Sequence, residues 1–337
     1  MEPYRVGVSP HIRQEENTRS IMLDVCIALI PSLIWGSYVF GLRVLVIALI
    51  AVLSCVGLEW LSQKIMRRPV TVSDGSALVS GLLLAMNLPA SVPLWLIPLG
   101  AAFAIVLVKQ LFGGIGKNFV NPVLAARVFL FLSYPIYMSR FTEPFVHLDP
   151  FSISPDSSRI ADAVTSATPL SVLKQGQIPE NISITDLLTG SHAGCIGEGA
   201  SFILLAGFLY LTVRKVITPH IPLSFLGTVA LLSYLFPQAG GRMEFMIYSL
   251  SSGGLLLGAI FMATDYTTSP VTRGGKIVYG ILCGALTVFI RFFGAYSEGV
   301  SFAILLSNLL VWYLDRLFRP RPYGLEKRFG TKKERAV

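Results

Sequence analysis

A short polar stretch near the middle of the chain carries hydroxyl groups that could accept a covalent modification. Its sequence is Asp162-Ala163-Val164-Thr165-Ser166-Ala167-Thr168-Pro169-Leu170. We expect this segment of small residues to be flexible and exposed, so that a modifying enzyme could reach the Thr168 hydroxyl. An ordinary Ser/Thr loop has the same composition, and the residue types alone do not separate these two interpretations.

Two ionisable residues lie in or beside apolar sequence. Arg127 stands nine residues into a predicted membrane helix, 119–138. A lone charge at such a place costs roughly 2.5–3.5 kcal/mol on insertion scales, so it usually faces a partner, a cavity or a cofactor. Asp265 follows a short Gly-bearing apolar segment and could close an ion or flavin site. We therefore predict Arg127 and Asp265 as residues of a membrane flavin or ion site.

Other site chemistries find little support in the sequence. The four cysteines show no C-x-x-C or Cys/His spacing, which argues against a zinc or iron–sulfur site within this chain. The four histidines have no visible Ser or Asp partner, so we predict neither a hydrolytic site nor a catalytic residue. The net charge of +8 does not indicate nucleic-acid binding, because the basic residues flank apolar runs, where they face lipid headgroups.

The elements that must position these residues are apolar helices. Of the 337 residues, 53% are hydrophobic and 14% are charged, against roughly a quarter charged in an average soluble domain. Uncharged runs of about 20 residues, the length that a bilayer core requires, recur along the chain. They predict an all-α polytopic membrane protein with ten transmembrane helices, at about 21–40, 43–60, 74–88, 91–111, 119–138, 199–213, 217–236, 244–263, 277–294 and 298–317.

The distribution of Lys and Arg orients these helices. With both termini in the cytoplasm, 20 of the 27 basic residues lie at inside ends and loops and six lie outside. The polar start of the chain predicts no cleaved signal peptide. The resulting organisation is a cytoplasmic segment 1–20, a first membrane repeat 21–138, an extracytoplasmic loop 139–198, a second membrane repeat 199–317 and a basic cytoplasmic tail 318–337.

The two membrane halves resemble each other in layout. Each has two ordinary helices, then a short Gly/Ser-bearing segment, then two more helices. The short segments share letters, Ser80-Gly81-Leu82-Leu83-Leu84-Ala85-Met86-Asn87 and Gly253-Gly254-Leu255-Leu256-Leu257-Gly258-Ala259. Five crossings in each half would invert the second repeat relative to the first. Broken third helices in two inverted halves predict a site near mid-membrane at the repeat interface.

The chain resembles a known family at these residues. The similarity covers about residues 1–320 and is to the RnfD component of the Rnf complex and its relative NqrB, a component of the sodium-pumping NADH:quinone oxidoreductase. It rests on the following stretches: Asp74-Gly75-Ser76, Gly81-Leu82-Leu83-Leu84, Asn87-Leu88-Pro89, Gly114-Ile115-Gly116-Lys117-Asn118-Phe119-Val120-Asn121-Pro122, Ala125-Ala126-Arg127, Ser166-Ala167-Thr168-Pro169-Leu170, Ala263-Thr264-Asp265 and Ser269-Pro270.

The resemblance implies a covalent flavin. In the family, a flavin transferase recognises Asp-x-x-Ser/Thr-x-Ala-Thr and joins FMN through its phosphate to the last threonine. Here Asp162, Thr165 and Ala167 match the motif, Thr168 is the acceptor, and Ser166 stands where the family often has Gly. The resemblance also implies a second, non-covalent flavin, riboflavin, within the membrane part.

The function implied by the resemblance is that of a membrane component of an ion-translocating ferredoxin:NAD⁺ oxidoreductase. Such a component would relay electrons and help to couple them to Na⁺ or H⁺ translocation across the bacterial inner membrane, without catalysing the whole reaction alone. Its expected partners are Rnf subunits A, B, C, E and G, the flavin transferase and membrane lipid. Two alternatives stay open on the residues: a small-solute transporter, which inverted five-helix repeats also build, and a structural scaffold within the complex.

Overall fold

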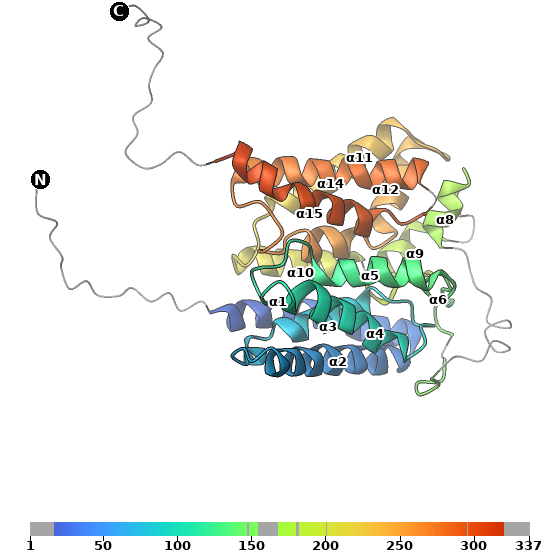
Figure 1. Ribbon diagram of the computed structural model, residues 1–337. Coiled ribbons are helices and arrows are strands. Elements are labelled where there is room, and N and C mark those ends of the chain that lie inside the picture. The colour runs from blue at the N-terminus through green and yellow to red at the C-terminus, as the bar shows by residue number, and fades with distance from the viewer. Residues whose placement is uncertain are drawn as a thin grey trace, which may run out of the picture.

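The computed structural model describes residues 17–146, 148–153, 168–179, 182–199, 201–294 and 296–319. Within these ranges every regular element is a helix, and the β-type pairing is an isolated bridge between Pro89 and Cys195 (Figure 1). The helices in chain order are α1 Thr18–Phe40, α2 Arg43–Ile65, η1 Val72–Asp74, α3 Ser76–Met86, α4 Leu96–Ala102, η2 Phe103–Gln110, α5 Pro122–Ser133, α6 Pro135–Met138, α8 Pro169–Lys174, α9 Ile184–Thr189, η3 Ile196–Glu198, α10 Ser201–Val213, α11 His220–Leu235, α12 Arg242–Ser251, α13 Leu255–Leu257, η4 Gly258–Met262, α14 Arg273–Phe293 and α15 Val300–Leu317.

Several of these helices are fit to cross a membrane. In the described part of the chain, α1, α2, α14 and α15 are long and apolar enough, and α12 with α13–η4 makes a fifth candidate bent by 62°. The shorter apolar helices, of 10–17 residues, are α3, α4–η2, α5, α10 and α11. Each predicted crossing contains one of these apolar segments. The helical architecture expected of a polytopic membrane protein is confirmed, whereas the ten crossings, the inverted repeat and the domain limits stay predictions.

Close approach of helices in the first half depends on a glycine. A Cβ on Gly81 of α3 would lie 2.6 Å from the Cα of Val52 in α2, so a larger residue there would push the two helices apart. After Asn87 the chain leaves the helix and returns to it only at α4. The fully buried Arg43 holds this irregular stretch, because its guanidinium donates to the carbonyls of Ala90 and Val92, each at 2.9 Å.

The second half contains a broken segment of its own. Helix α12 ends at Ser251, and Gly253 and Gly254 adopt positive φ angles of 74° and 61° before α13 begins. Left-handed backbone of this kind favours glycine. The segment continues as the π-helical turn η4 and ends next to Asp265. The letters shared by the two halves therefore differ in structure: Ser80–Met86 lie within helix α3, whereas Gly253 and Gly254 form a break before the short helix α13.

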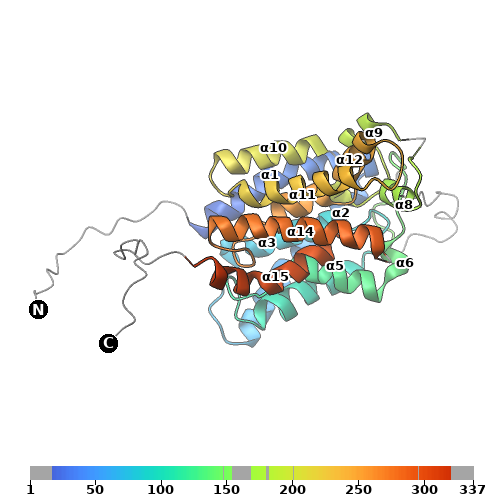
Figure 2. The same ribbon diagram turned by 90° about the horizontal axis from the view of Figure 1, so that it is seen from above.

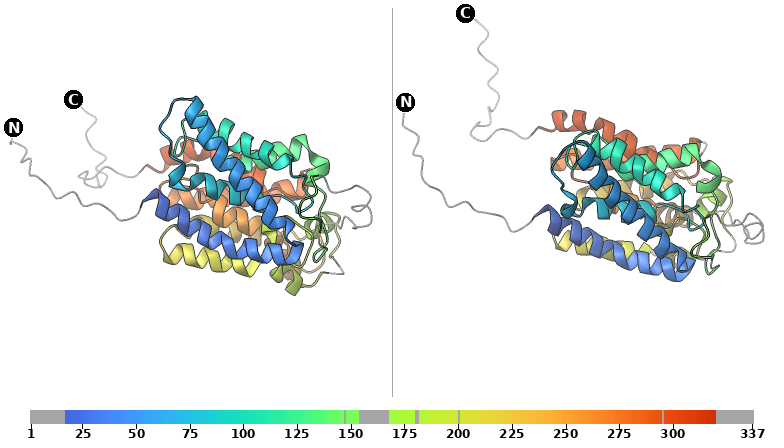
Figure 3. Two further views of the ribbon diagram at one scale, coloured as in Figure 1. Left: turned by 90° about the horizontal axis from the view of Figure 1, so that it is seen from below. Right: turned by 60° about the horizontal axis from the view of Figure 1, so that its bottom comes forward.

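The two halves pack side by side. Helices α1 and α10 run next to each other in the views from above and from below, and α5 lies beside α15 (Figures 2 and 3). The Tyr210 hydroxyl of α10 donates to Asp24 of α1 at 2.8 Å, and Arg214 pairs with the same carboxylate at 3.2 Å. The start of α1 and the end of α15 lie at one end of the bundle, and α6, α8 and α9 lie at the other (Figure 1).

The connection between the halves has more structure than the sequence indicated. Its short helices α8 and α9 pack on α12 through a second small apolar core of Leu170, Leu173, Leu187, Ala239, Phe245 and Tyr248. The Tyr248 hydroxyl also donates to the carbonyl of Ile182 at 2.5 Å. The described parts of this connection are thus docked onto the membrane helices.

Candidate functional site

Arg127 is buried, and its charge is partnered. Asn121 caps helix α5 by accepting from Val123 N at 3.0 Å, and Pro122 follows at the first helical position, which favours a helix start there. Arg127 is one and a half turns into this helix and is 7% exposed. Its guanidinium forms an ion pair with Glu298 and donates to Asn87 Oδ1 at 2.6 Å. The cost of placing its charge in the core is therefore offset by specific partners.

Both broken segments and the inter-half connection meet at Arg127. Asn87 closes α3, and Ile196 N donates to the carbonyl of Leu88 at 3.1 Å, which brings the Cys195 region alongside. Arg127 Nη2 lies 3.4 Å from Cys195 Sγ and 3.8 Å from Glu198 Oε1.

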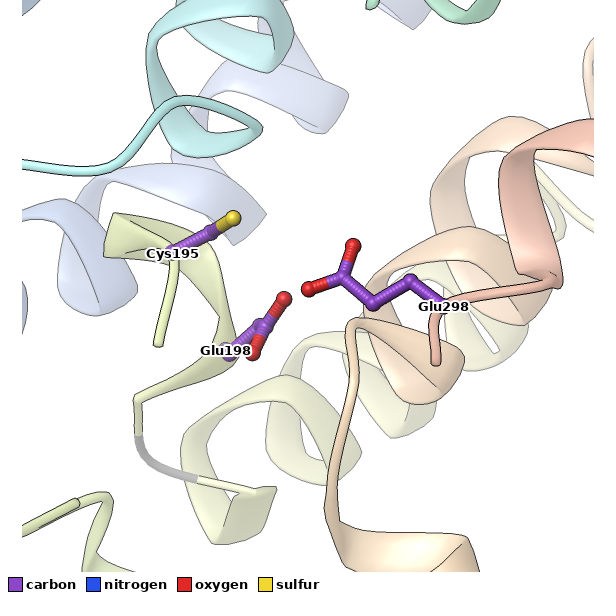
Figure 4. A group of neighbouring side chains, drawn as sticks. All are labelled: Cys195, Glu198 and Glu298. Carbon is purple, nitrogen blue, oxygen red and sulfur yellow. The ribbon is translucent and has the colours of Figure 1, made fainter. Parts of the chain in front are cut away.

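The break of the second half also reaches Arg127. A Cβ at Gly254 would lie 3.5 Å from Arg127 Nη1 and 3.4 Å from Glu198 Oε1. Figure 4 shows Glu198 and Glu298 directing their carboxylates toward the same space as the Cys195 thiol. The prediction of a polar site between the two halves fits this arrangement.

Asp265 lies elsewhere, on a cavity at the end of the bundle where α1 begins. The cavity walls come from α1, α3, η2, α5 and the segment around η4, and its polar lining includes Ser76, Lys109, Asn118, Asn121 and Asp265. Asp265 Oδ2 accepts from the hydroxyls of Thr267 and Thr268 at 3.2 and 3.4 Å. The structure thus separates Arg127 and Asp265, which the sequence assigned to one class of site.

A second buried ion pair borders that cavity. Lys109 Nζ lies 2.8 Å from Glu59 Oε1 and donates to the Ser76 hydroxyl at 2.7 Å. Gln110 Nε2 donates to the same glutamate at 2.9 Å. Glu59 and Lys109 are each 3% exposed or less, so this network fixes α2 against η2 in the core.

Thr168 is the one residue of the proposed attachment motif within the described ranges. It is the N-cap of α8, and its hydroxyl accepts from Ser171 N at 3.3 Å. The expectation of an exposed acceptor is wrong for this conformation, because the residue is 7% exposed. The next residues, Pro169 and Leu170, are also buried, and Leu170 belongs to the small apolar core. Its neighbours Asp162, Thr165, Ser166 and Ala167 lie outside the residues that the structure describes.

Sequence reasoning missed Glu198, Glu298 and Cys195 as site residues. Glu198 is one of several acids in the predicted outer loop, and Glu298 falls at the boundary between two predicted crossings. Cys195 has no ligand spacing to other residues along the chain. The available signal was the requirement of Arg127 for a carboxylate, but nothing in the linear pattern indicated which one.

Known proteins resemble this chain along nearly its whole length. The model of the NQR2, RnfD, RnfE family matches residues 5–324. The chain belongs to this family. A relative from Acetobacterium woodii is named as the D subunit of a Na⁺-translocating ferredoxin:NAD⁺ oxidoreductase complex; it is 44% identical over 324 residues, which are 96% of each chain.

Two further relatives carry similar names. A protein of Clostridium ljungdahlii, the D subunit of a proton-translocating ferredoxin:NAD⁺ oxidoreductase complex, is 34% identical, with 96% of this chain and 97% of the relative covered. One from Stutzerimonas stutzeri, the D subunit of an ion-translocating oxidoreductase complex, is 39% identical over 91% and 92% of the two chains. The resemblance inferred from the motifs is thereby confirmed.

Proposed function

We propose that this chain is the RnfD component of an Rnf-type ferredoxin:NAD⁺ oxidoreductase, a translocase whose electron transport drives Na⁺ or H⁺ across the bacterial inner membrane. The observation that carries the proposal is the match of the family model to residues 5–324, with relatives of that name covered at 96% of their length or more. The chain would act only within the complex, beside subunits A, B, C, E and G and surrounded by membrane lipid.

Thr168 is the proposed attachment point of covalent FMN. Its hydroxyl oxygen accepts a long hydrogen bond from Ser171 N, so a phosphoester there would weaken only a weak hydrogen bond. Lys174, at the other end of α8, is a cation whose Nζ donates to the carbonyl of Tyr296 at 3.1 Å. Because Thr168 is 7% exposed, we expect the flavin transferase to act before α8 docks, or with α8 displaced.

The cavity beside Asp265 is the proposed place for riboflavin. It is largely apolar, as a flavin ring system requires, and it carries a few polar groups that could fix the orientation of a ring. Asn118 Nδ2 already donates to Thr267 Oγ1 at 3.0 Å, so the amide is held in place on the wall. Flavins supply the electron transfer, while Asn118, Lys109 and Asp265 would position the ring and set the charge around it.

The positive-inside distribution of Lys and Arg supports an orientation with the start of α1 and the end of α15 at the cytoplasmic face. The α8 end of the bundle, with Thr168, would then lie outside. The cavity would lie toward the soluble electron donors and the covalent flavin toward the far side, so the electron path would cross the membrane core past Arg127.

Intact-mass measurement tests the flavin assignment. The chain produced together with its flavin transferase should gain the mass of one FMN phosphoester, and Thr168→Ala should abolish that gain. Thr189→Ala, in the neighbouring helix α9, is the matched control and should keep it. An increment that persists in Thr168→Ala would refute the site.

The alternatives give different results in the same preparations. A small-solute transporter would move solute into liposomes as the isolated chain without bound flavin. A scaffold would let the complex with Thr168→Ala assemble normally and keep full electron transfer, whereas the proposed function requires that electron transfer to fall.

A further inference from the structure

The carboxylate cluster, Glu198 and Glu298 with Cys195 beside them, surrounds one end of the Arg127 guanidinium. One oxygen of each carboxylate and the Cys195 Sγ all lie within 4.8 Å of one another (Figure 4). The two glutamates come from opposite sides of the site, Glu198 from η3 and Glu298 from the segment before α15. Oxygen atoms of two elements far apart in the sequence therefore converge on one buried point.

Glu198 has an oxygen without a hydrogen-bond donor. Its Oε1 is buried and accepts no hydrogen bond from the described residues, and the whole residue is 5% exposed. The nearest cation, Arg127 Nη2, is 3.8 Å away, beyond hydrogen-bonding distance, and the same nitrogen pairs with Glu298. A buried carboxylate oxygen left in this way is costly unless something binds it.

The cations around the cluster do not occupy every carboxylate oxygen. Arg127 lies within ion-pairing distance of both carboxylates, and the buried Arg291 acts on both electrostatically from further away. Arg291 is the next cation, but its guanidinium donates to the carbonyls of Ser249 and Ser252 at 2.6 and 3.0 Å. Among the described residues it forms no ion pair with either glutamate at 4.0 Å or less, so neither arginine donates a hydrogen bond to Glu198 Oε1.

We infer that Glu198 and Glu298 form a binding site for one monovalent cation, Na⁺ or a proton, at the point where the two broken segments meet. A proton would be shared between the two carboxyl groups; Na⁺ would be held by their oxygens. Either ion would occupy the Oε1 of Glu198, which accepts no hydrogen bond from the described residues. Gly254 leaves the space open, because a Cβ there would stand 3.4 Å from that oxygen.

Cys195 is not a ligand in this inference. Hard monovalent cations prefer oxygen, whereas a thiolate beside two carboxylates would suit zinc or iron. A transition metal would also need a deprotonated Cys195. Substitution of this residue therefore separates the two kinds of metal chemistry.

The role of this ion rests on the proposed function, since a cation site in the core of an ion-translocating complex would be a station for the transported ion. The existence of the site does not depend on that function. Occupancy of the cluster is measurable without flavin and without electron transfer, so failure of the site and failure of the proposed function give different results.

Infrared difference spectroscopy on the purified complex tests the site. Without Na⁺, wild type should show the carbonyl band of a buried protonated carboxyl group, and Glu198→Gln should remove it. If Na⁺ is the ion, added Na⁺ should remove the wild-type band and ²²Na⁺ should bind, with affinity lowered at least tenfold in Glu198→Gln and Glu298→Gln. If the ion is a proton only, Na⁺ should leave the band unchanged.

Controls make each outcome decisive. Glu244→Gln, at the start of α12 and outside the cluster, should leave band and Na⁺ affinity unchanged, and Cys195→Ser should change Na⁺ affinity less than twofold. If Glu198→Gln does not assemble, Glu198→Asp keeps the charge on a shorter side chain and must shift the band or the Na⁺ affinity. The inference is overturned if the glutamate variants leave both unchanged, or if the complex holds a stoichiometric transition metal that Cys195→Ser removes.

Discussion

Replacing Arg127 by Gln would remove the cation that two buried carboxylates share. Removal of one partner of a buried ion pair typically costs roughly 3–5 kcal/mol, because the remaining charge is left uncompensated. Arg127 and the Glu298 side chain are both largely buried, at 8% and 14% side-chain exposure, so the range for buried pairs applies. We expect Arg127→Gln to lower the free energy of unfolding by about 4 kcal/mol.

A double-mutant cycle separates the pair from the rest of the site. In a Glu298→Gln background, Arg127→Gln should cost less, about 2 kcal/mol, because the hydrogen bond to Asn87 and the longer ion pair with Glu198 are then what it removes. SDS titration in mixed micelles, followed by far-ultraviolet circular dichroism, measures each variant. Arg214→Gln is the matched control, because that side chain is 56% exposed and exposed pairs contribute about 1 kcal/mol or less. Equal costs of Arg127→Gln in the two backgrounds would show that no such pair exists.

Three further predictions concern packing and the outer connection. Gly81→Ala should destabilise the chain by about 1–3 kcal/mol through the clash with α2, whereas Gly57→Ala, with open space around its Cβ, should be neutral or stabilise it by up to about 1 kcal/mol in the same titration. Arg43 Nη1 also donates to the carbonyls of Asp149 and Ser152 in the connection between the halves, so Arg43→Gln should release that part of the chain and speed its proteolysis. Unchanged cleavage would contradict this. The hydrogen bond from the Ser183 hydroxyl lowers the pKa of Asp186. The stability that this bond gives to α9 is therefore present above the ordinary carboxyl pKa of about 3.9 and is lost as the pH falls through the lowered value. Ser183→Ala should speed α9 amide exchange more at neutral pH than in acid, where only the bond from Asp186 N to the Ser183 hydroxyl is lost; equal effects at both would contradict the assignment.

The helices could be predicted because their signal is local. Apolar runs of bilayer length and caps such as Asn121-Pro122 specify where a helix forms whatever its neighbours are. The charge of Arg127 within such a run correctly indicated a partnered position. The same reasoning placed Asp265 beside a buried site, although the structure gives it a separate cavity.

The carboxylate cluster could not be predicted because its members enter the core from irregular backbone. Glu198 follows a polar connection, and Glu298 stands between two helices, so both look solvated in the linear sequence. The exposure of Thr168 was predicted wrongly for a related reason. Its small neighbours suggested exposure, but Leu170 and Leu173 carry the start of α8 into an apolar core that includes Phe245 from α12. Packing partners from distant sequence decided burial in each case.

The broken segment of the second half, which begins at Gly253, connects the surroundings of Thr168, Arg127 and Asp265. A Cβ at Gly253 would meet the Leu170 side chain at 2.7 Å, two residues beyond Thr168, and the next residue, Gly254, faces Arg127 and Glu198. The helix Leu255–Met262 then runs to the cavity that contains Asp265, a rise of about 12 Å at 1.5 Å per residue. A change at the glycine break would alter the packing of α8, the ion pair of Arg127 and the wall of the cavity together. Coupling between electron transfer and ion binding requires an element that both sites share and that has two arrangements. We expect the 62° bend of this segment to be that element.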